Sequence, residues 1–92
     1  MRDIHFPGRS PVYSQLGMVS TSHPLATKAA ADILTIGGNA MDAAITAASV
    51  LAVVESHSTG IGGDLFCLYY PKNASKVLAL NASGKAPKAA SL

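Results

Sequence analysis

The stretch ESHSTGIGGDLF, residues 55–66, joins a long apolar segment to a short aromatic one. Its glycines, Gly60, Gly62 and Gly63, give the backbone a freedom that other residues lack. A phosphate-binding loop would place such glycines after a strand and before a helix. The predicted order here is helix, glycines, strand, and the spacing fits neither G-x-G-x-x-G nor a P-loop. Nucleotide binding at this stretch is therefore disfavoured.

The residues before this stretch predict two helices. Pro24 suits the first position of a helix, where its missing N–H would have no helical partner. The glycine pair at 37–38 ends that helix, because glycine adopts the left-handed C-terminal conformation without strain. Lys28 and Asp32 have the i, i+4 spacing of a helical ion pair. One apolar face of this helix is expected to carry Leu25, Ala29, Ile33 and Ile36.

A second helix is predicted over residues 40–54. Asn39 can cap its first N–H groups, and Asp42 stands three residues later, where a capping box places an acid. The helix body is apolar or small on nearly every side, and a helix of that kind is buried all round. A chain of 92 residues can hardly cover it. The sequence therefore indicates that further polypeptide packs around this helix.

The residues after the glycines predict a β-hairpin. Residues 65–70 are aromatic and β-prone and are expected to form a strand. A turn is expected at 71–75, a second strand at 76–80, and a loop over 81–92. Two helices followed by a hairpin indicate an α+β fold.

The N-terminal part is expected to be less regular. Residues 1–16 contain prolines and a glycine that break regular elements, which indicates an extended arm. Residues 18–21 form a short β-prone run that predicts a strand. The N-terminus lacks the apolar region of a secretory signal, and the longest apolar run, 43–54, is too short to cross a bilayer. A cytoplasmic protein without a membrane segment is expected.

The composition is unusually apolar for so short a chain. Hydrophobic residues make up 49% and charged residues 13%, whereas ordinary domains carry about 25% charged residues. The chain either hides a large face against a partner or is part of something larger; a small alanine-rich domain is the alternative. The basic residues are scattered, so nucleic-acid binding is unsupported. Cys67, the single cysteine, is expected to be a buried apolar thiol without a disulfide.

The polar residues near the glycines do not define a site of their own. A metal site needs three or more ligands, and only Glu55, His57 and Asp64 are near. The first two are better explained as the polar end of a helix. Ser58 and Thr59 are close to His57 in sequence, yet a catalytic triad is recognised by geometry. No metal, no cofactor and no catalytic residue is predicted in this chain.

Three motifs occur in order along the sequence. The first is Gly37-Gly-Asn-Ala-Met-Asp-Ala-Ala44, the second is Val54-Glu-x-x-Ser-Thr-Gly-Ile-Gly-Gly63, and Phe66 follows. Together they resemble the N-terminal part of the large subunit of the γ-glutamyltransferase (γ-glutamyltranspeptidase) family. The resemblance implies part of an αββα sandwich of the N-terminal-nucleophile hydrolase type, from a precursor several times longer than this chain. In that fold the glycine loop is a tight connection from helix to core strand, with backbones passing close to each other.

The resemblance also implies a chemistry. Members cut themselves internally, and the freed threonine attacks a γ-glutamyl amide through its hydroxyl, with its own α-amine as base. The acyl group then passes to water or to an amino acid or peptide. That threonine belongs to the smaller subunit, and no threonine here matches its motif: Thr21, Thr27, Thr35, Thr46 and Thr59. This chain alone is expected to be inactive, with the remainder of the precursor or the small subunit as its partner in an oligomeric enzyme.

The run NASGKAP, residues 81–87, corresponds to a substrate-binding run of glutathione-using members, in which an arginine grips the α-carboxylate of the glutamyl group. Ser83 stands where that arginine is expected and lacks the two-pronged charge of a guanidinium. Lys85 is a candidate point charge for the same carboxylate, with a solvated surface lysine as the alternative. Asp64 stands where many members carry another glycine, and is expected to be a hydrogen-bonded carboxylate at the strand edge. These departures weaken glutathione as the substrate and favour an intracellular, acylase-like branch acting on γ-glutamyl or similar acyl amides.

A second function stays open. A truncated, non-catalytic module that self-associates or docks on a partner would also explain the missing nucleophile and the apolar surface. The first hypothesis makes residues 1–92 the N-terminal segment of a γ-glutamyltransferase-like domain. In it, Gly60, Gly62, Gly63 and Asp64 form a structural loop beside the candidate substrate-binding residues Ser83 and Lys85.

Overall fold

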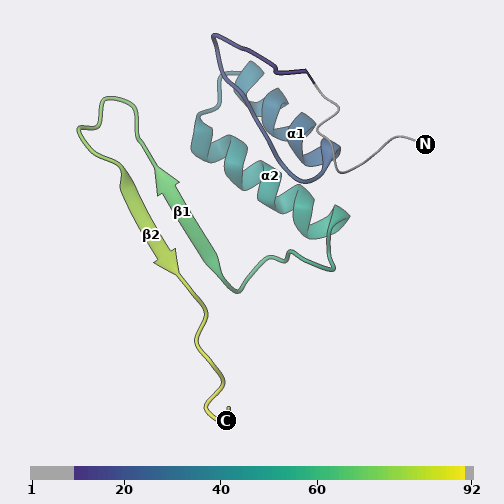
Figure 1. Cartoon of the computed structure of the whole chain (residues 1–92), viewed down its shortest axis with the longest axis vertical. Helices are drawn as coiled ribbons and strands as arrows, with labels where there is room; N and C mark the ends of the chain where they lie inside the picture. Colours follow the sequence, from purple (N-terminus) through teal and green to yellow (C-terminus); the bar gives the residue numbers. More distant parts are fainter. Residues whose placement is uncertain (1–9, 91–92) are drawn as a thin grey trace.

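The computed structural model describes residues 10–90, which form two helices followed by a two-stranded antiparallel sheet (Figure 1). Helix α1 spans Pro24–Thr35 and helix α2 spans Ala40–Val54. Strand β1, Leu65–Tyr69, pairs with strand β2, Leu78–Ala82. The helices pack against each other, and the hairpin lies to one side of them (Figure 1). The predicted order of two helices and a hairpin is confirmed.

The end of α1 is fixed by its glycine pair. Gly37 adopts a φ of +97°, in the left-handed region that glycine enters without strain. Its N–H donates to the carbonyl of Leu34 at 3.2 Å, and the N–H of Gly38 donates to the carbonyl of Ile33 at 2.9 Å. These bonds satisfy carbonyls that the end of a helix would otherwise leave unpaired. The predicted stop at residues 37–38 is therefore confirmed.

The start of α2 is a complete capping box, as predicted. The Asn39 side-chain oxygen accepts the N–H groups of Met41 and Asp42 at 2.8 and 3.0 Å. In return, the Asp42 carboxylate accepts the N–H of Asn39 at 2.9 Å. Reciprocal bonds of this kind fix where a helix begins. The predicted ion pair within α1 is also present, with 2.6 Å between the Lys28 Nζ and Asp32 Oδ2 atoms.

The two helices meet along a seam of alanines. Its members are the buried residues of the described chain: Ala26, Ala30, Ala43 and Ala47. Methyl side chains let two helix backbones approach closely, and the larger Ile33 and Leu34 pack around the seam. The predicted inner face of α1 is right for Ile33, which packs against the seam, and wrong for Leu25 and Ile36, which are exposed. Ala26 and Ala30 are buried in their place. The larger apolar residues suggested the wrong face because burial in α1 selects small side chains.

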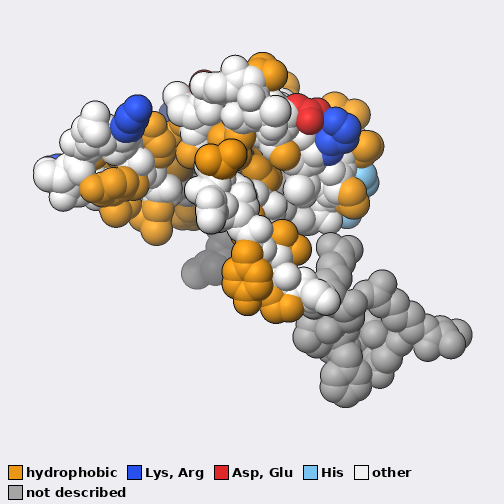
Figure 2. Space-filling model, turned by 90° about the horizontal axis from the view of Figure 1, so that it is seen from above, with side chains coloured by type: hydrophobic (Ala, Val, Ile, Leu, Met, Phe, Trp, Pro, Cys, Tyr) orange, Lys and Arg blue, Asp and Glu red, His pale blue; other side chains and the backbone are white. Residues whose placement is uncertain are grey.

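Much of the apolar surface is uncovered in the described residues. On α2, Ile45 is 59% and Val53 is 78% exposed, so residues 10–90 do not cover this helix by themselves, which agrees with the expectation from the sequence. Hydrophobic side chains are spread across the face seen in Figure 2, with few charged ones between them. The Cα radius of gyration is 16.6 Å, whereas a compact domain of this length has one of about 12 Å. The segment is thus open rather than folded around a core of its own.

The hairpin pairs Leu65 with Ala82 at its open end and Tyr69 with Leu78 at its closed end. The second strand begins two residues later than the predicted 76–80. The connection is longer than predicted, because residues 75 and 76 form a bend after the turn in which the N–H of Ala74 donates to the carbonyl of Pro71 at 3.1 Å. Cys67 is only partly buried, contrary to prediction, because no described element covers the sheet.

The segment before α1 is irregular. The predicted strand at 18–21 is wrong, because no strand lies beside it in the described chain; Val19 instead packs against the alanine seam. Residues 10–16 contain no helix or strand, and the rest of the predicted arm lies outside the described residues. Between residues 10 and 90, neither helix has the length and apolar character that a membrane span requires.

Candidate functional site

The candidate site lies at the open end of the hairpin. In an antiparallel pair the start of one strand lies beside the end of the other, and here Leu65 pairs with Ala82. The glycine loop, residues 60–64, enters β1 at this end, and the segment 83–85 leaves β2 at the same end. The hairpin therefore brings the structural glycine loop next to the stretch that holds the candidate substrate-binding residues.

A hydrogen bond ties these two stretches to each other. The Asp64 Oδ1 atom accepts the backbone N–H of Gly84 in a short contact. At the neighbouring Ser83, the backbone N–H donates to the side-chain oxygen of Asn81, within β2, at 3.1 Å. Asp64 is thus a hydrogen-bonded carboxylate at the edge of the strand, as the sequence indicated. Its partner, Gly84, was not singled out by the sequence.

The glycines of the loop differ in what they require. Gly63 adopts a φ of +117°, which side chains of other residues resist. A Cβ at Gly62 would meet no atom within 4 Å, and one at Gly60 would come only to 3.9 Å from the carbonyl oxygen of Gly62. The expected close passage of backbones is therefore absent at Gly60 and Gly62 within the described chain. Only Gly63 is required here by its backbone conformation.

Ser83 and Lys85 are both exposed at this end of the hairpin. The Ser83 hydroxyl makes no hydrogen bond to another described residue, and Lys85 forms no ion pair between residues 10 and 90. A serine hydroxyl can donate one hydrogen bond, and a lysine ammonium can donate three and carries a positive charge. Neither donor is used within the described residues.

A cavity of about 390 Å³ lies between α2 and the glycine loop. Thr59 lines it, and its hydroxyl lies 2.7 Å from the carbonyl oxygen of Leu51 and 3.1 Å from that of Glu55. These contacts bind the loop to the end of α2, so the hydroxyl has a structural task there. Asp64 also lines the cavity, and its hydrogen bond to Gly84 places it next to the candidate substrate-binding segment.

The polar residues at the end of α2 do not assemble into a reactive group. The Glu55 carboxylate accepts the hydroxyl of Ser22 at 2.8 Å, which joins the end of α2 to the start of α1. His57 is exposed. Among residues 10–90, no group of three or more His, Cys, Asp or Glu side chains is placed to hold a metal ion. The structure therefore assigns Glu55 to the packing of the two helices.

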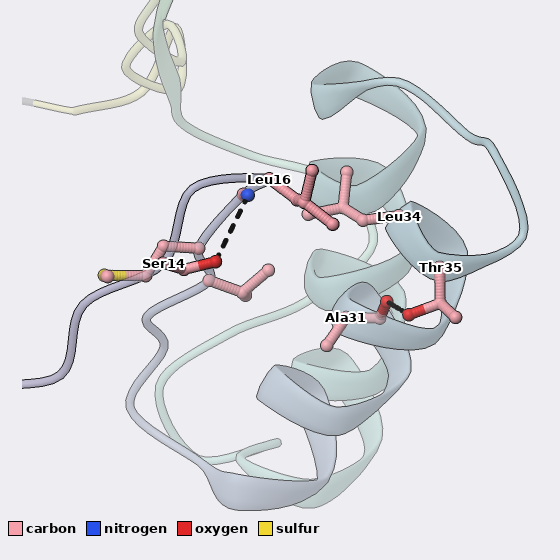
Figure 3. A pocket seen from close by; sticks show the side chains of 8 residues that line it. Ser14, Leu16, Ala31, Leu34 and Thr35 are labelled. Atoms are coloured by element: carbon pink, nitrogen blue, oxygen red, sulfur yellow. Dashed lines mark hydrogen bonds between the residues drawn. The ribbon is translucent and has the colours of Figure 1, made fainter.

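A second cavity, of about 370 Å³, lies between α1 and the segment before it (Figure 3). Leu16 and Leu34 line it, and the Thr35 hydroxyl beside it donates to the carbonyl of Ala31 at 2.9 Å. Its lining contains no titratable side chain. It is an apolar recess left by the irregular segment, and it lies on the helix pair rather than at the hairpin end.

Comparison with known proteins assigns the chain to a family. The sequence model described as Gamma-glutamyltranspeptidase matches residues 26–92. The chain belongs to this family. The match covers the helix pair, the glycine loop and the hairpin, which are the elements that build the candidate site.

Individual relatives agree with the assignment. The chain is 45% identical over 71 residues to the "Glutathione hydrolase-like YwrD proenzyme" of Bacillus subtilis. That alignment covers 77% of this chain and 14% of the Bacillus protein. It is 42% identical over 76 residues to the "Oxamate amidohydrolase proenzyme" of Klebsiella pneumoniae. That alignment covers 83% of this chain and 14% of the Klebsiella protein. The crystal structure of the Helicobacter pylori gamma-glutamyltranspeptidase superposes with a TM-score of 0.76 at 35% identity, covering 90% of this chain and 24% of that one.

The comparisons also fix the architecture of this gamma-glutamyltranspeptidase family chain. Its helices and hairpin are part of the αββα sandwich of the N-terminal-nucleophile hydrolases, as the sequence predicted. The chain spans about one seventh of the length of the curated relatives named above. An incomplete sandwich is consistent with the open shape of the segment and its exposed apolar faces.

Proposed function

We propose that residues 1–92 are the N-terminal segment of an amidohydrolase that cleaves a γ-glutamyl or similar acyl amide and passes the acyl group to water, an amino acid or a peptide. The observation that carries the proposal is the family match over residues 26–92 together with relatives named as a glutathione hydrolase-like proenzyme and an oxamate amidohydrolase proenzyme. The first name describes a hydrolase-like protein and the second an amidohydrolase.

The proposed reaction is nucleophilic acyl transfer by a threonine that the remainder of the precursor supplies. The threonine hydroxyl adds to the amide carbonyl, and its proton is taken by the α-amine of the same residue. The C–N bond breaks, the leaving amine takes the proton, and an acyl ester remains. Water or an amine then attacks this ester, releases the product and restores the threonine. Self-cleavage of the precursor would expose that α-amine.

This chain would contribute substrate binding. Lys85 is proposed to attract the carboxylate of the acyl group, and Ser83 to donate a hydrogen bond to it. Both are exposed at the hairpin end, and neither side chain is tied up by another described residue. A lysine ammonium is a point charge without the bidentate geometry of arginine. We therefore expect glutathione to be a poor substrate compared with other amides that carry a carboxylate.

The test is steady-state kinetics of the protein made from the complete gene. Lys85→Ala should raise KM for a carboxylate-bearing acyl amide about tenfold, since a hydrogen bond to a charged group contributes about 1.5 kcal/mol or more. Lys88→Ala is the matched control, because it removes a second exposed lysine close by in the same tail. Unchanged KM and kcat in Lys85→Ala would exclude the proposed role of this lysine.

The non-catalytic alternative rests on the uncovered apolar faces. They would suit self-association or docking on another protein, and they suit packing against the rest of the family fold equally well. We favour packing against the rest of the family fold, because the relatives are about seven times longer than this chain. A cytoplasmic, oligomeric enzyme completes the proposal; cell fractionation and sedimentation of the complete protein test those two properties.

A further inference from the structure

Asp64 makes a contact that the proposed acyl transfer does not use. Its carboxylate stands just before β1, and its Oδ1 atom accepts the N–H of Gly84 just beyond β2. The two residues are 20 positions apart in sequence. Because the strand ladder ends at the pair Leu65–Ala82, this side-chain bond extends the connection between the two stretches past the end of the sheet.

The segment after β2 depends on side chains for its backbone hydrogen bonds. Among residues 10–90, no backbone carbonyl accepts the N–H of Ser83 or Gly84. Asn81 accepts the first and Asp64 accepts the second. Asn81 lies only two residues away, so its bond shapes a local turn. Beyond the strand pairing, the Asp64 bond is the hydrogen bond that joins this segment to the glycine loop among residues 10–90.

The space around Gly84 is matched to this contact. A Cβ at Gly84 would lie 2.9 Å from Asp64 Oδ1 and 3.9 Å from its Cγ, closer to the oxygen than real Cβ atoms come. An alanine would therefore displace the carboxylate. Asp64 supplies the acceptor, and Gly84 lacks the side chain that would keep the carboxylate away from its N–H.

We propose that Asp64 is a positioning residue for Lys85, and that it acts as a hydrogen-bond acceptor rather than as a charge. Lys85 follows Gly84 directly, so the direction of its side chain depends on how the Gly84 backbone is held. Asp64 and Lys85 form no ion pair, which leaves the ammonium available to a ligand. The inference rests on the proposed function, because it takes Lys85 to bind the substrate carboxylate.

The first experiment measures backbone hydrogen exchange in residues 81–87 of the complete protein by mass spectrometry. Asp64→Ala should speed exchange at Gly84 about tenfold, since the Gly84 N–H loses its acceptor. Asp64→Asn keeps a side-chain oxygen and should stay within about threefold of the wild type. Asp42→Ala is the matched control, because it also removes an exposed carboxylate that accepts one backbone N–H, at the helix cap instead. It should leave residues 81–87 unchanged.

The second experiment compares two chromogenic substrates, a γ-glutamyl anilide and a 4-aminobutyryl anilide that lacks the α-carboxylate. Asp64→Ala should raise KM for the first about tenfold, with kcat within about twofold, because loss of a ground-state contact acts on KM. KM for the second should hardly change. Asp64→Asn should restore KM for the γ-glutamyl anilide, and Gly84→Ala should behave like Asp64→Ala.

The outcomes separate the inference from the proposed function. Unchanged exchange in Asp64→Ala would show that the bond does not hold the segment, and would overturn the inference. Equal losses for both substrates, or Asp64→Asn behaving like Asp64→Ala, would likewise overturn it. If the wild-type protein cleaves neither anilide while exchange responds as expected, the proposed function fails together with the role of Lys85, and only the structural anchor stands.

Discussion

The glycine pair between the helices allows the sharpest structural prediction, which concerns Gly38→Ala. A Cβ at Gly38 would lie 2.4 Å from Ile33 Cγ2 and 2.9 Å from the Ile33 carbonyl oxygen. The methyl group can rotate away, but the carbonyl belongs to the helix backbone and accepts the Gly38 N–H at 2.9 Å. The new side chain therefore has to push against the same atom that fixes the end of α1.

The expected loss of stability follows from those two effects. A weakened backbone hydrogen bond costs about 1 kcal/mol, and overpacking against atoms that cannot move freely costs about 1–3 kcal/mol. Gly38→Ala should therefore cost about 2–4 kcal/mol. Gly37 provides the comparison, because its φ is +97° but a Cβ there meets nothing within 4 Å. Gly37→Ala should cost about 1–2 kcal/mol from backbone strain alone, and Gly37→Asn less, since asparagine tolerates this conformation better.

The assay is thermal unfolding of the complete protein, followed by calorimetry and far-ultraviolet circular dichroism. The predicted order of destabilisation is Gly38→Ala, then Gly37→Ala, then Gly37→Asn, and all three should leave the oligomeric state unchanged. A Gly38→Ala protein as stable as Gly37→Asn would refute the reasoning, because it would show that the Ile33 carbonyl is not confined as the structure places it.

Three further predictions concern single side chains. Asn39→Ala should lower the free energy of unfolding by about 1 kcal/mol, because Met41 and Asp42 lose their N-cap acceptor; denaturant titration measures this, and no loss would contradict the capping box. Lys28→Ala should lower the free energy of unfolding by less than about 0.5 kcal/mol, because the Lys28 side chain is 71% exposed and surface ion pairs contribute little. A larger loss in the same titration would show that the pair is more than a surface contact. Ser83→Arg should lower KM for glutathione at least about tenfold by adding a bidentate carboxylate ligand, and unchanged kinetics would remove this position from the substrate site.

Local features of the fold were predictable because their causes lie within a few residues of one another. The cap at Asn39 and Asp42 joins atoms three positions apart, and the helix stop at Gly37 depends on one residue's backbone. The same holds for the start at Pro24 and for the existence of the first strand. Sequence patterns report such contacts directly.

Features that depend on distant residues were not predictable. The buried face of α1 is set by alanines of α2, so a rule that favours large apolar residues selected Leu25 and Ile36 wrongly. Residues 18–21 have β-prone side chains, but no strand lies beside them among residues 10–90. At the candidate site, the position of Asp64 was foreseen but its partner Gly84 was not, because that contact depends on the register of the hairpin. The sequence feature that could have pointed to this contact is Asp64 itself, which stands where many family members carry a glycine.

The central claim is that this chain is part of a self-processing amidohydrolase whose nucleophile lies elsewhere in the precursor. The most direct measurement is the intact mass of the protein made from the complete gene, followed over time after purification, with N-terminal sequencing of each product. A self-processing amidohydrolase should appear first as a long precursor and then as two pieces, the smaller beginning with threonine. A protein that stays a single uncleaved species, or a cleavage that exposes no N-terminal threonine, would contradict the claim.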